Sequence, residues 1–320
     1  DYRAMTKLKS TYADGLVKQI ADDGRIHTTF QNLVTATGRL SSTDPNLQNI
    51  PVRTELGSEI RRMFVPSDGC VFVDADYSQI ELRVLAHMSG DSAMCDAFRR
   101  GQDIHTRTAA EIHGVPMDQV TPEMRRSAKA VNFGIVYGIS GFGLARNAHI
   151  TRREADGFIR TYFERYPGVR AFMDACVEKG RALGYAETLF GRRRELFELA
   201  SPNRNVRSFG ERAAMNTPVQ GTAADIIKLA MVQVARRLEE GGYRARRSES
   251  RSSRRGSFCR CTTSWWWNAP SQRRTKSAPW CKAPWRTWSA SRCRCWPRYR
   301  AAATGKRRID SGKGAFPDPA

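Results

Sequence analysis

The sequence predicts an α+β protein in which helices predominate, followed by a C-terminal quarter of different character. One short apolar run, Val71 to Asp76, has the composition of a buried strand that ends in acidic residues. After Gly242, Arg, Ser, Pro and Cys dominate, and neither helical nor strand periodicity is visible. Apolar residues at helical spacing occur in four stretches, Asp1–Ile20, Ser127–Tyr137, Ala155–Ala182 and Gly210–Glu240.

Charge separates the two parts of the chain. The 320 residues carry a formal net charge of +21. From Arg244 to Ala320 there are 20 Lys and Arg against 3 Asp and Glu, whereas the residues before Arg244 hold 33 against 29. A strong basic excess favours a polyanionic partner, most often nucleic acid. The first part of the chain is only mildly basic, so its charge alone does not predict phosphate binding.

The pattern of cysteines and apolar runs favours an intracellular protein over a secreted, zinc-binding or membrane-spanning one. Cys70, Cys95 and Cys176 stand singly, as expected of reduced intracellular thiols. The two C-x-C pairs of the tail lack the spacing and the histidines of a zinc site. No signal peptide and no apolar run long enough to span a bilayer is present. We therefore expect a cytoplasmic protein without a membrane partner.

The ordered part begins with a helix and continues to the predicted strand. Leu8, Tyr12, Leu16 and Ile20 recur every four residues, so the chain starts inside a helical pattern. Residues 35–51 are polar and rich in turn formers. The predicted strand at residues 71–76 then delivers its acids to the start of a helix at residues 78–87.

The later elements are helical. The stretch at residues 127–137 ends at Gly138. Residues 155–182 form two helices separated near Pro167-Gly168, because proline starts a helix more readily than it continues one. A long helical stretch follows at residues 210–240, and we place the boundary of the ordered region near Tyr243.

A stripe of side chains on one predicted helix has the composition of a nucleotide site. Arg125, Lys129, Phe133 and Tyr137 recur every four residues, and each step turns a helix by about 400°. The stripe changes from cationic to aromatic, which suits a triphosphate followed by a sugar and a base. The alternative is an amphipathic helix whose basic end is simply solvated, and spacing alone does not decide between the two.

Asp76 at the end of the predicted strand is the second candidate. A carboxylate that follows a buried strand is costly unless it binds a metal ion or another partner. Mg²⁺ prefers carboxylate and phosphate oxygens, as in two-metal phosphoryl transfer. The alternative, which residue type alone favours, is that Asp76 or Ser78 caps the helix that follows.

The two stretches together resemble the family A DNA polymerases, represented by bacterial DNA polymerase I. Residues 76–83 resemble that family's motif A, and residues 125–138 resemble its motif B. Three further blocks resemble the family in the same order, and the resemblance as a whole covers roughly Asp1 to Tyr243. They are Thr37–Ser42 with Asn46–Arg53, Asp103–Thr106 with Thr108–Ala110, and Arg212–Asn216 with Gln220–Asp225.

The resemblance implies roles at the nucleotide. Asp76 would be catalytic and, with the backbone carbonyl of Tyr77, would hold two Mg²⁺ ions. Glu81 would crowd the sugar 2′ position and exclude ribonucleotides. Lys129 would be catalytic as the proton donor to pyrophosphate. The implied nucleotide-binding set is Tyr77, Gln79, Glu81, His105, Arg125, Lys129, Phe133 and Tyr137; a core role remains the alternative for His105.

The resemblance also implies contacts with primer–template DNA. Minor-groove contacts test the shape of a base pair without reading its sequence, because acceptors recur there in all pairs. Lys7 and Lys9 would touch backbone phosphates, and Gly138 would leave room for Tyr137 at the templating position. A buried salt bridge is the alternative for Arg39. The implied DNA-binding set is Lys7, Lys9, Arg39, Arg53, Gly138, Arg212, Asn216 and Gln220.

The implied architecture is that of a right-handed polymerase fragment acting as a monomer on primer–template DNA and deoxynucleoside triphosphates. Its fingers are mainly helical and its palm has a small antiparallel sheet, which the altered C-terminus would leave incomplete. The expected divisions are residues 1–24 (end of a thumb helix), 25–83 (palm with motif A), 84–205 (fingers with motif B), 206–243 (palm helices) and 244–320 (a disordered tail).

The resemblance ends where the family requires a second catalytic acid. That acid belongs to a His-Asp-Glu motif in a β-hairpin, yet no His follows His149 and no acid lies between Glu249 and Asp310. Allowed codons for residues 256–268, regrouped by one base, spell Val-Val-Leu-Gln-Val-His-Asp-Glu-Leu-Val-Val-Glu. The same shift converts residues 303–310 into Asn-Trp-Glu-Glu-Ala-His followed by a stop. These readings predict a frameshifted tail.

Three functions are therefore open at this point. The first is a DNA-directed DNA polymerase by lineage, impaired or inactive as written because one carboxylate cannot hold two Mg²⁺ ions about 4 Å apart. The second is a catalytically dead binder of primer–template and nucleotide. The third treats the Arg/Ser-rich tail as an RNA-binding segment.

Overall fold

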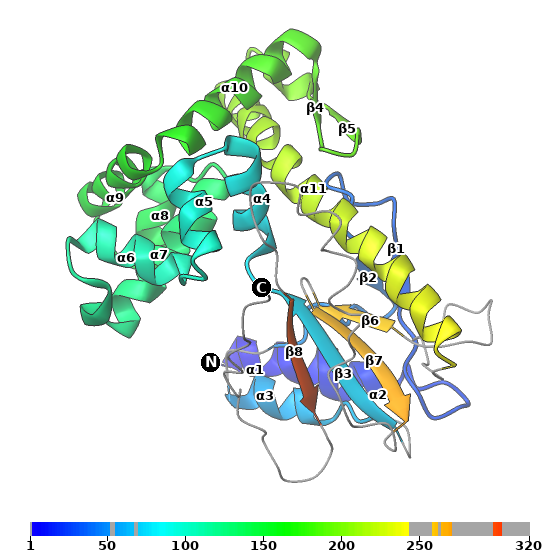
Figure 1. The fold of residues 1–320 in the computed structure, drawn as a ribbon. Helices are drawn as coiled ribbons and strands as arrows, with labels where there is room; N and C mark the ends of the chain where they lie inside the picture. The colour runs from blue at the N-terminus through cyan, green and yellow to red at the C-terminus, as the bar shows by residue number, and fades with distance from the viewer. Residues whose placement is uncertain are drawn as a thin grey trace, which may run out of the picture.

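The computed structural model shows an α+β protein in which a helical lobe and a four-stranded sheet are joined by one long helix (Figure 1). The structure describes residues 2–51, 55–66, 70–242, 258–261, 264–270 and 297–302. None of the helices in these ranges is long and apolar enough to cross a membrane.

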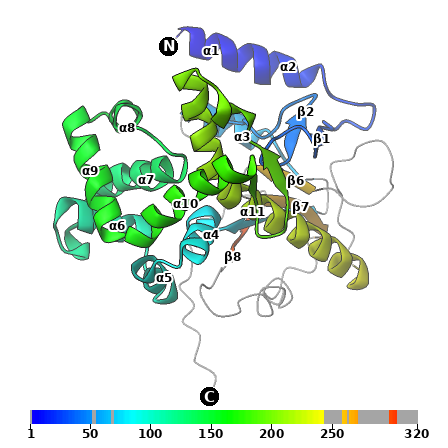
Figure 2. The same cartoon turned by 90° about the horizontal axis from the view of Figure 1, so that it is seen from above.

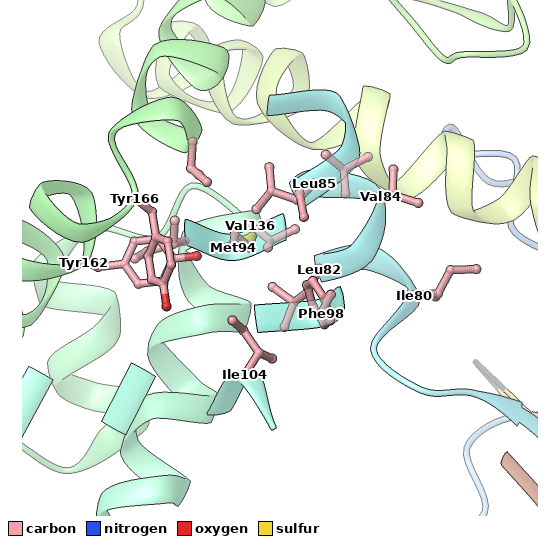
Figure 3. Packing of buried hydrophobic residues seen from close by; sticks show 14 of the residues in the cluster. Ile80, Leu82, Val84, Leu85, Met94, Phe98, Ile104, Val136, Tyr162 and Tyr166 are labelled. Carbon is pink, nitrogen blue, oxygen red and sulfur yellow. The ribbon is translucent and has the colours of Figure 1, made fainter. Parts of the chain in front are cut away.

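The helical lobe encloses the largest apolar core. Leu85, Val136, Tyr162 and Tyr166 are almost completely buried there and belong to one cluster built from several helices (Figure 3). A short 3-10 turn at Met117–Gln119 precedes α7. The helices of this lobe are α4 (Ile80–Ser89), α5 (Ser92–Arg99), α6 (Ile104–His113), α7 (Pro122–Val136), α8 (Gly141–Ala148), α9 (Arg152–Arg165) and α10 (Pro167–Leu183).

Helix α11 (Arg204–Glu240) crosses from the helical lobe toward the sheet (Figure 1). Val219 and Ile227 of α11 belong to the core of the lobe, so the long helix is anchored by burial. A hairpin of β4 (Tyr185–Glu187) and β5 (Arg193–Glu195), followed by a 3-10 turn at Phe197–Ala200, lies between α10 and α11.

The N-terminal segments form a second, smaller unit. Tyr12, Leu16 and Leu47 make its buried core, and Ile60 and Phe64 pack against them. Figure 2 shows α1 and α2 along one edge of the molecule, away from α5 to α9. The elements are α1 (Tyr2–Leu8), a π-helical turn (Lys9–Ala13), α2 (Asp14–Val17), β1 (Thr29–Gln31), β2 (Ser41–Thr43) and α3 (Glu55–Arg62).

The larger sheet is built around β3 (Cys70–Tyr77). Its strand order is β6-β7-β3-β8, and every pairing is antiparallel. Its other strands are β6 (Phe258–Cys261), β7 (Ser264–Pro270) and β8 (Pro297–Ala302), all from the C-terminal quarter. The register sets Asp76 opposite Ser264 on one side and Arg298 on the other.

Three strands of this sheet come from the tail. The sequence predicts a disordered tail and an incomplete palm sheet, whereas β6, β7 and β8 are arranged with β3 in the sheet of the described residues. The division at residues 244–320 and the incompleteness of the sheet stay predictions. Ladder hydrogen bonds join backbone groups and depend little on side-chain identity, so a buried strand with two open edges accepts such partners. The tryptophan run of β7 also has high strand propensity. The other residues of 244–320 lie outside the described ranges.

The elements expected before Tyr243 are present. The predicted strand is β3, and the predicted helix after it is α4. The stretch at residues 155–182 is divided into α9 and α10 at Tyr166, next to Pro167 as predicted. The last helical stretch extends further toward the N-terminus than the sequence indicates, because Asn203 caps it by accepting from the backbone N–H of Asn205.

Candidate functional site

The turn between β3 and α4 brings the predicted acidic residues to the edge of the helical lobe. Gln79 precedes α4 in the left-handed conformation, with φ 58° and ψ 35°, which allows an abrupt turn out of the strand. Gln79 occupies the N-cap position of α4, and its side chain makes no cap hydrogen bond.

Glu81 is the centre of a polar cluster. Its carboxylate accepts hydrogen bonds from the Arg39 guanidinium and, at 3.0 Å, from the Tyr137 hydroxyl. The side chain is only 7% exposed, so the cation compensates most of the cost of burying a charge. Three segments that are far apart in sequence, the turn before β2, the start of α4 and the end of α7, therefore meet at one carboxylate.

Helix α11 closes against the end of α7 at the same place. Gly138 follows α7 with φ 63°. A Cβ at that position would lie 2.8 Å from Met215 Cε and 3.0 Å from Arg212 Cγ, so a larger residue would have to displace both side chains, and glycine also suits the positive φ. Asn216 donates from Nδ2 to the backbone carbonyl of Tyr137 at 3.4 Å. The structure thus places Arg212 and Asn216 beside Tyr137, as the sequence order alone could not show.

The predicted stripe on α7 is present. Lys129 is exposed, Phe133 and Tyr137 are half-buried, and the Lys129 ammonium lies 5.9 Å from the centre of the Phe133 ring. Arg125 donates to Asp103 Oδ2 at 2.7 Å. Burial alone would raise the pKa of Asp103, but hydrogen bonds from Arg125 and from the backbone of Thr106 hold that pKa below its ordinary value.

His105 lies beneath this stripe and is nearly fully buried. Its Nδ1 faces Asn132 Nδ2 at 3.1 Å, and its ring lies 5.7 Å from that of Phe133. Because the amide donates to Nδ1, the proton of the neutral ring is on Nε2. Burial lowers the pKa of His105 to about 4; Asp103 opposes this shift, and Arg125 and Lys129 reinforce it. At neutral pH the side chain is therefore an uncharged hydrogen-bond donor.

Sequence reasoning missed two residues of this group. Asp103 caps α6 by accepting from the backbone N–H groups of His105 at 2.9 Å and Thr106 at 3.1 Å. Asn132 orients His105 and accepts a hydrogen bond from the Thr108 hydroxyl at 3.3 Å. The Asp three residues before Thr106 was a visible capping signal, whereas nothing in the sequence pairs Asn132 with a histidine on another helix.

A pocket of about 560 Å³ opens between α7, α8 and α11. It contains the aromatic half of the α7 stripe and reaches Arg212 on α11. Its lining residues are Ala130, Phe133, Gly134, Tyr137, Gly138, Ile139, Ser140, Phe142, Gly143, Arg146, Asn147 and Arg212.

Other predicted DNA-contact residues lie apart from this cluster. Lys7 and Lys9 are exposed on the N-terminal helices, where Lys9 pairs with Asp14 at 2.5 Å. Gln220 is 7% exposed on α11. Arg53 lies outside the described residues. The DNA-binding roles of all these residues remain predictions.

Asp76 is the next-to-last residue of β3 and is half-buried, but the ligand set for metal ions around it is small. Within the ranges that the structure describes, no three His, Cys, Asp or Glu side chains gather to form a metal site. The register pairs Asp76 with a serine and an arginine, where a second carboxylate would be required. These residues do not fit a two-metal centre, so we assign no chemical step of this chain to metal ions.

The sequence model of DNA polymerase family A matches residues 1–248. This chain belongs to DNA polymerase family A. It is 53% identical over 247 residues to DNA polymerase I of Lactococcus lactis subsp. lactis (strain IL1403), a match that covers 77% of this chain and 28% of that protein. It is 57% identical over 248 residues to DNA polymerase I of Bacillus caldotenax, again covering 77% of this chain and 28% of the relative.

A solved family A structure resembles the fold as well. It is the POL domain of Pol1 from M. smegmatis in complex with DNA primer-template and dNTP, with a TM-score of 0.78 and 45% sequence identity. The similarity covers 84% of this chain and 46% of that one. The match thus spans less than half the length of each of these family A relatives. Family A DNA polymerases are in general metal-dependent enzymes.

Proposed function

We propose that this chain is the nucleotide- and primer–template-binding part of a DNA-directed DNA polymerase, and that as written it transfers few or no nucleotides. Membership of family A supports the first half of the proposal. The M. smegmatis polymerase domain, which binds primer-template and dNTP, has the same fold. The second half rests on the missing carboxylate beside Asp76.

One observation carries the binding proposal. Arg39, Glu81 and Tyr137 form a hydrogen-bonded cluster where residues 76–83, which resemble motif A, meet residues 125–138, which resemble motif B. Glu81 is buried and held from two sides, so it cannot easily swing away. A sugar seated against Glu81 would have no room for a 2′ hydroxyl, because that group would displace a packed and paired carboxylate. We infer that this cluster selects deoxynucleotides.

The α7 stripe would hold the nucleotide. Arg125 and Lys129 supply cations for the triphosphate, and His105 would add a neutral hydrogen bond through Nε2 if the pocket opens toward it. Phe133 would face the sugar. Tyr137 would stack at the templating position over Gly138.

The primer–template would lie along α11 and the turn before β2. Arg39, Arg212 and Asn216 converge near Tyr137, which supports contacts with the minor groove of the terminal base pairs. Gln220 would need to turn out of its buried position to join them. Lys7 and Lys9 would contact phosphates further along the duplex.

The reaction would be nucleotidyl transfer. The 3′ hydroxyl of the primer loses its proton to water as its oxygen attacks the α-phosphorus. A new P–O bond forms, the α–β bridging bond breaks, and pyrophosphate leaves with its charge partly neutralised by Arg125 and Lys129. Lys129 would give its proton to the leaving pyrophosphate. In an intact family member we expect Asp76 and the Tyr77 carbonyl to hold Mg²⁺ for this step.

The position of the β6–β7 hairpin supports a frameshift as the cause of impairment. In the shifted reading, His-Asp-Glu spans the codons of residues 261–264. Strand β6 ends at Cys261 and β7 begins at Ser264, and Ser264 is the register partner of Asp76. An in-frame chain would therefore carry its second acid next to Asp76, whereas this chain carries uncharged residues there.

Primer extension tests the proposal on the 320-residue chain. A labelled primer annealed to a template is incubated with the chain, Mg²⁺ and the four deoxynucleoside triphosphates, and binding of the same duplex is measured by fluorescence anisotropy. We expect binding without extension. Clear nucleotide incorporation would contradict the proposed impairment, and absent binding would contradict the proposed function.

Sequencing the gene across the codons for residues 243–256 separates an altered protein from an error in the recorded sequence. A single compensating base that restores His-Asp-Glu would show that the natural protein has the second acid. It would also exclude a selected RNA-binding tail. An unaltered frame would leave the tail as a true feature of the protein.

A further inference from the structure

A second ion pair with a buried carboxylate lies beside the turn that precedes Arg39. Arg192, in the hairpin between β4 and β5, pairs with Asp225 of α11. The other oxygen of Asp225 accepts from the Thr188 hydroxyl at 2.8 Å. Asp225 is only 7% exposed, so removal of either partner would leave an uncompensated buried charge or hydrogen-bonding group.

The hairpin around Arg192 is held in one shape. The Thr188 hydroxyl oxygen accepts from the backbone N–H groups of Phe190 at 3.3 Å and Arg192 at 3.2 Å. Leu189 donates from its backbone N–H to the Thr222 hydroxyl of α11 at 3.0 Å. These contacts hold the backbone of the hairpin against α11. The Arg192 side chain extends from the hairpin to the turn at Gly38.

The turn that precedes Arg39 packs directly on this guanidinium. Gly38 closes the turn by donating to the Thr35 carbonyl at 2.9 Å and has φ 74°. A Cβ at Gly38 would overlap the Arg192 guanidinium, so the bare Cα face of glycine is what the side chain covers. On the α11 side, a Cβ at Gly221 would lie 3.6 Å from the Thr37 carbonyl oxygen. The turn is thus enclosed by Arg192 and α11.

Arg39 is the next residue along the chain, and its guanidinium pairs with Glu81. The direction in which the Arg39 side chain leaves the backbone depends on where Gly38 is fixed. The three heavy atoms nearest to a Cβ placed on Gly38 all belong to the Arg192 guanidinium. The order of contact runs from Asp225 through Arg192 and Gly38 to Arg39 and Glu81.

We propose that Arg192 is a positioning residue for Arg39. The ion pair with Asp225 fixes the position of the Arg192 guanidinium, and the Gly38 turn packs against it. The position of this turn then directs the Arg39 side chain to Glu81 and to the primer terminus. The proposal deepens the proposed function, because it concerns the residue that we assign to the primer–template minor groove.

A double-mutant cycle on the full chain tests it. Primer–template affinity is measured by fluorescence anisotropy for the wild type, Arg192→Ala, Arg39→Ala and the double variant. We expect each single substitution to weaken binding about tenfold, and the double variant to bind about as weakly as either single one. A residue with a merely structural role elsewhere would give effects that multiply.

Matched variants guard against a folding defect. Arg193→Ala removes the neighbouring cation, whose partner Glu187 is on the hairpin itself at 3.2 Å, and should leave affinity unchanged. Arg192→Ala combined with Asp225→Asn leaves no unpaired buried charge, so it should fold and still bind about tenfold more weakly. Arg192→Lys keeps the charge without the planar contact and should give an intermediate affinity.

The same cycle measured as urea midpoints tests the coupling without DNA. If Arg192 sets the Arg39–Glu81 pair, the losses of stability from Arg192→Ala and Arg39→Ala should not add. A wild-type chain that binds no DNA but shows this coupling would refute the proposed function and leave the positioning role standing. Additive losses of stability, or a folded Arg192 variant with unchanged DNA affinity, would overturn the positioning role.

Discussion

Glu81 and Asp225 are both nearly fully buried carboxylates, and each is paired with one arginine and one hydroxyl group. Arg39 and Tyr137 serve Glu81, while Arg192 and Thr188 serve Asp225. A buried carboxylate stays charged only when such partners replace water. At the residue scale, the site is therefore an arrangement of compensated charges, and Asp76 differs because its register neighbours include no second acid.

His105 should make the stability of the chain fall on mild acidification. Its pKa is about 4 in the folded protein against the ordinary value of 6.5, so the unfolded chain binds more protons between these two values. The stabilisation is present above pH 6.5 and is lost as the pH falls toward 4. We expect titration of His105 to lower the free energy of unfolding by about 2 kcal/mol between pH 7.5 and pH 5.

Urea unfolding of the wild type and of His105→Gln at these two pH values measures the effect. The variant should lose less stability on acidification, although it starts from a lower value because Asn132 loses its partner. His149, which is exposed, provides the control: His149→Gln should retain the wild-type dependence. Equal pH dependence in the wild type and the His105 variant would show that His105 titrates normally in the folded protein.

At the scale of elements, the contact between α7 and α11 determines the shape of the site. Gly138 lets the end of one helix approach the side of the other, and Asn216 fastens them by a hydrogen bond to the Tyr137 carbonyl. The pocket beside Phe133 and Tyr137 depends on this approach. Neither helix alone would place a cation from α11 next to an aromatic ring of α7.

Gly138→Ala should disturb this contact more than the backbone conformation alone explains. The new methyl group would meet Met215 and Arg212 in addition to the strain of φ 63°. We expect a loss of about 2–3 kcal/mol in the free energy of unfolding. Gly184→Ala is the matched control, because Gly184 has φ 77° with open space around it and should cost only about 1 kcal/mol. Similar losses in both variants, read from urea unfolding, would mean that the close approach contributes nothing.

The elements also show what local sequence could and could not indicate. Periodicity predicted β3, α4 and the division between α9 and α10 because apolar spacing and proline act locally. The stripe Arg125 to Tyr137 followed from the same spacing. Asp103 and Asn132 did not follow, because their roles arise from contacts between α6 and α7 that no local pattern encodes. The role of Arg192 could not be predicted either. Its ion-pair partner Asp225 lies 33 residues away on α11, and the Gly38 turn that packs on it precedes β2.

At the scale of the whole molecule, the C-terminal quarter supplies strands to the sheet, but its described strands supply no acidic residue to the proposed active site. Strands β6, β7 and β8 complete a sheet around β3 although their side chains carry no acid near Asp76. Backbone hydrogen bonding can therefore be satisfied by a segment that supplies no carboxylate. The incompleteness of the palm sheet and the impairment of the reaction both stay predictions.

Restoring the reading frame should restore polymerase activity. We expect the frame-corrected chain to extend a primer. In that chain, Asp76→Ala should abolish extension but keep the affinity for primer–template within about twofold of the parent. The reason is that Asp76 acts on the transferred phosphate and makes no proposed DNA contact. Gel-based extension and anisotropy measure the two quantities. A loss of DNA binding together with extension would instead identify Asp76 as a structural residue.

The sequence by itself determined the family, the order of the helices, the strand that delivers Asp76 and the stripe on α7, because each depends on spacing or motif order within a short stretch. Only the tertiary structure decided that Glu81 joins Arg39 to Tyr137, that His105 is buried and neutral, and that the tail pairs with β3. These features depend on burial and on contacts between distant segments, which are set when the chain folds and are not carried by any single stretch of residues.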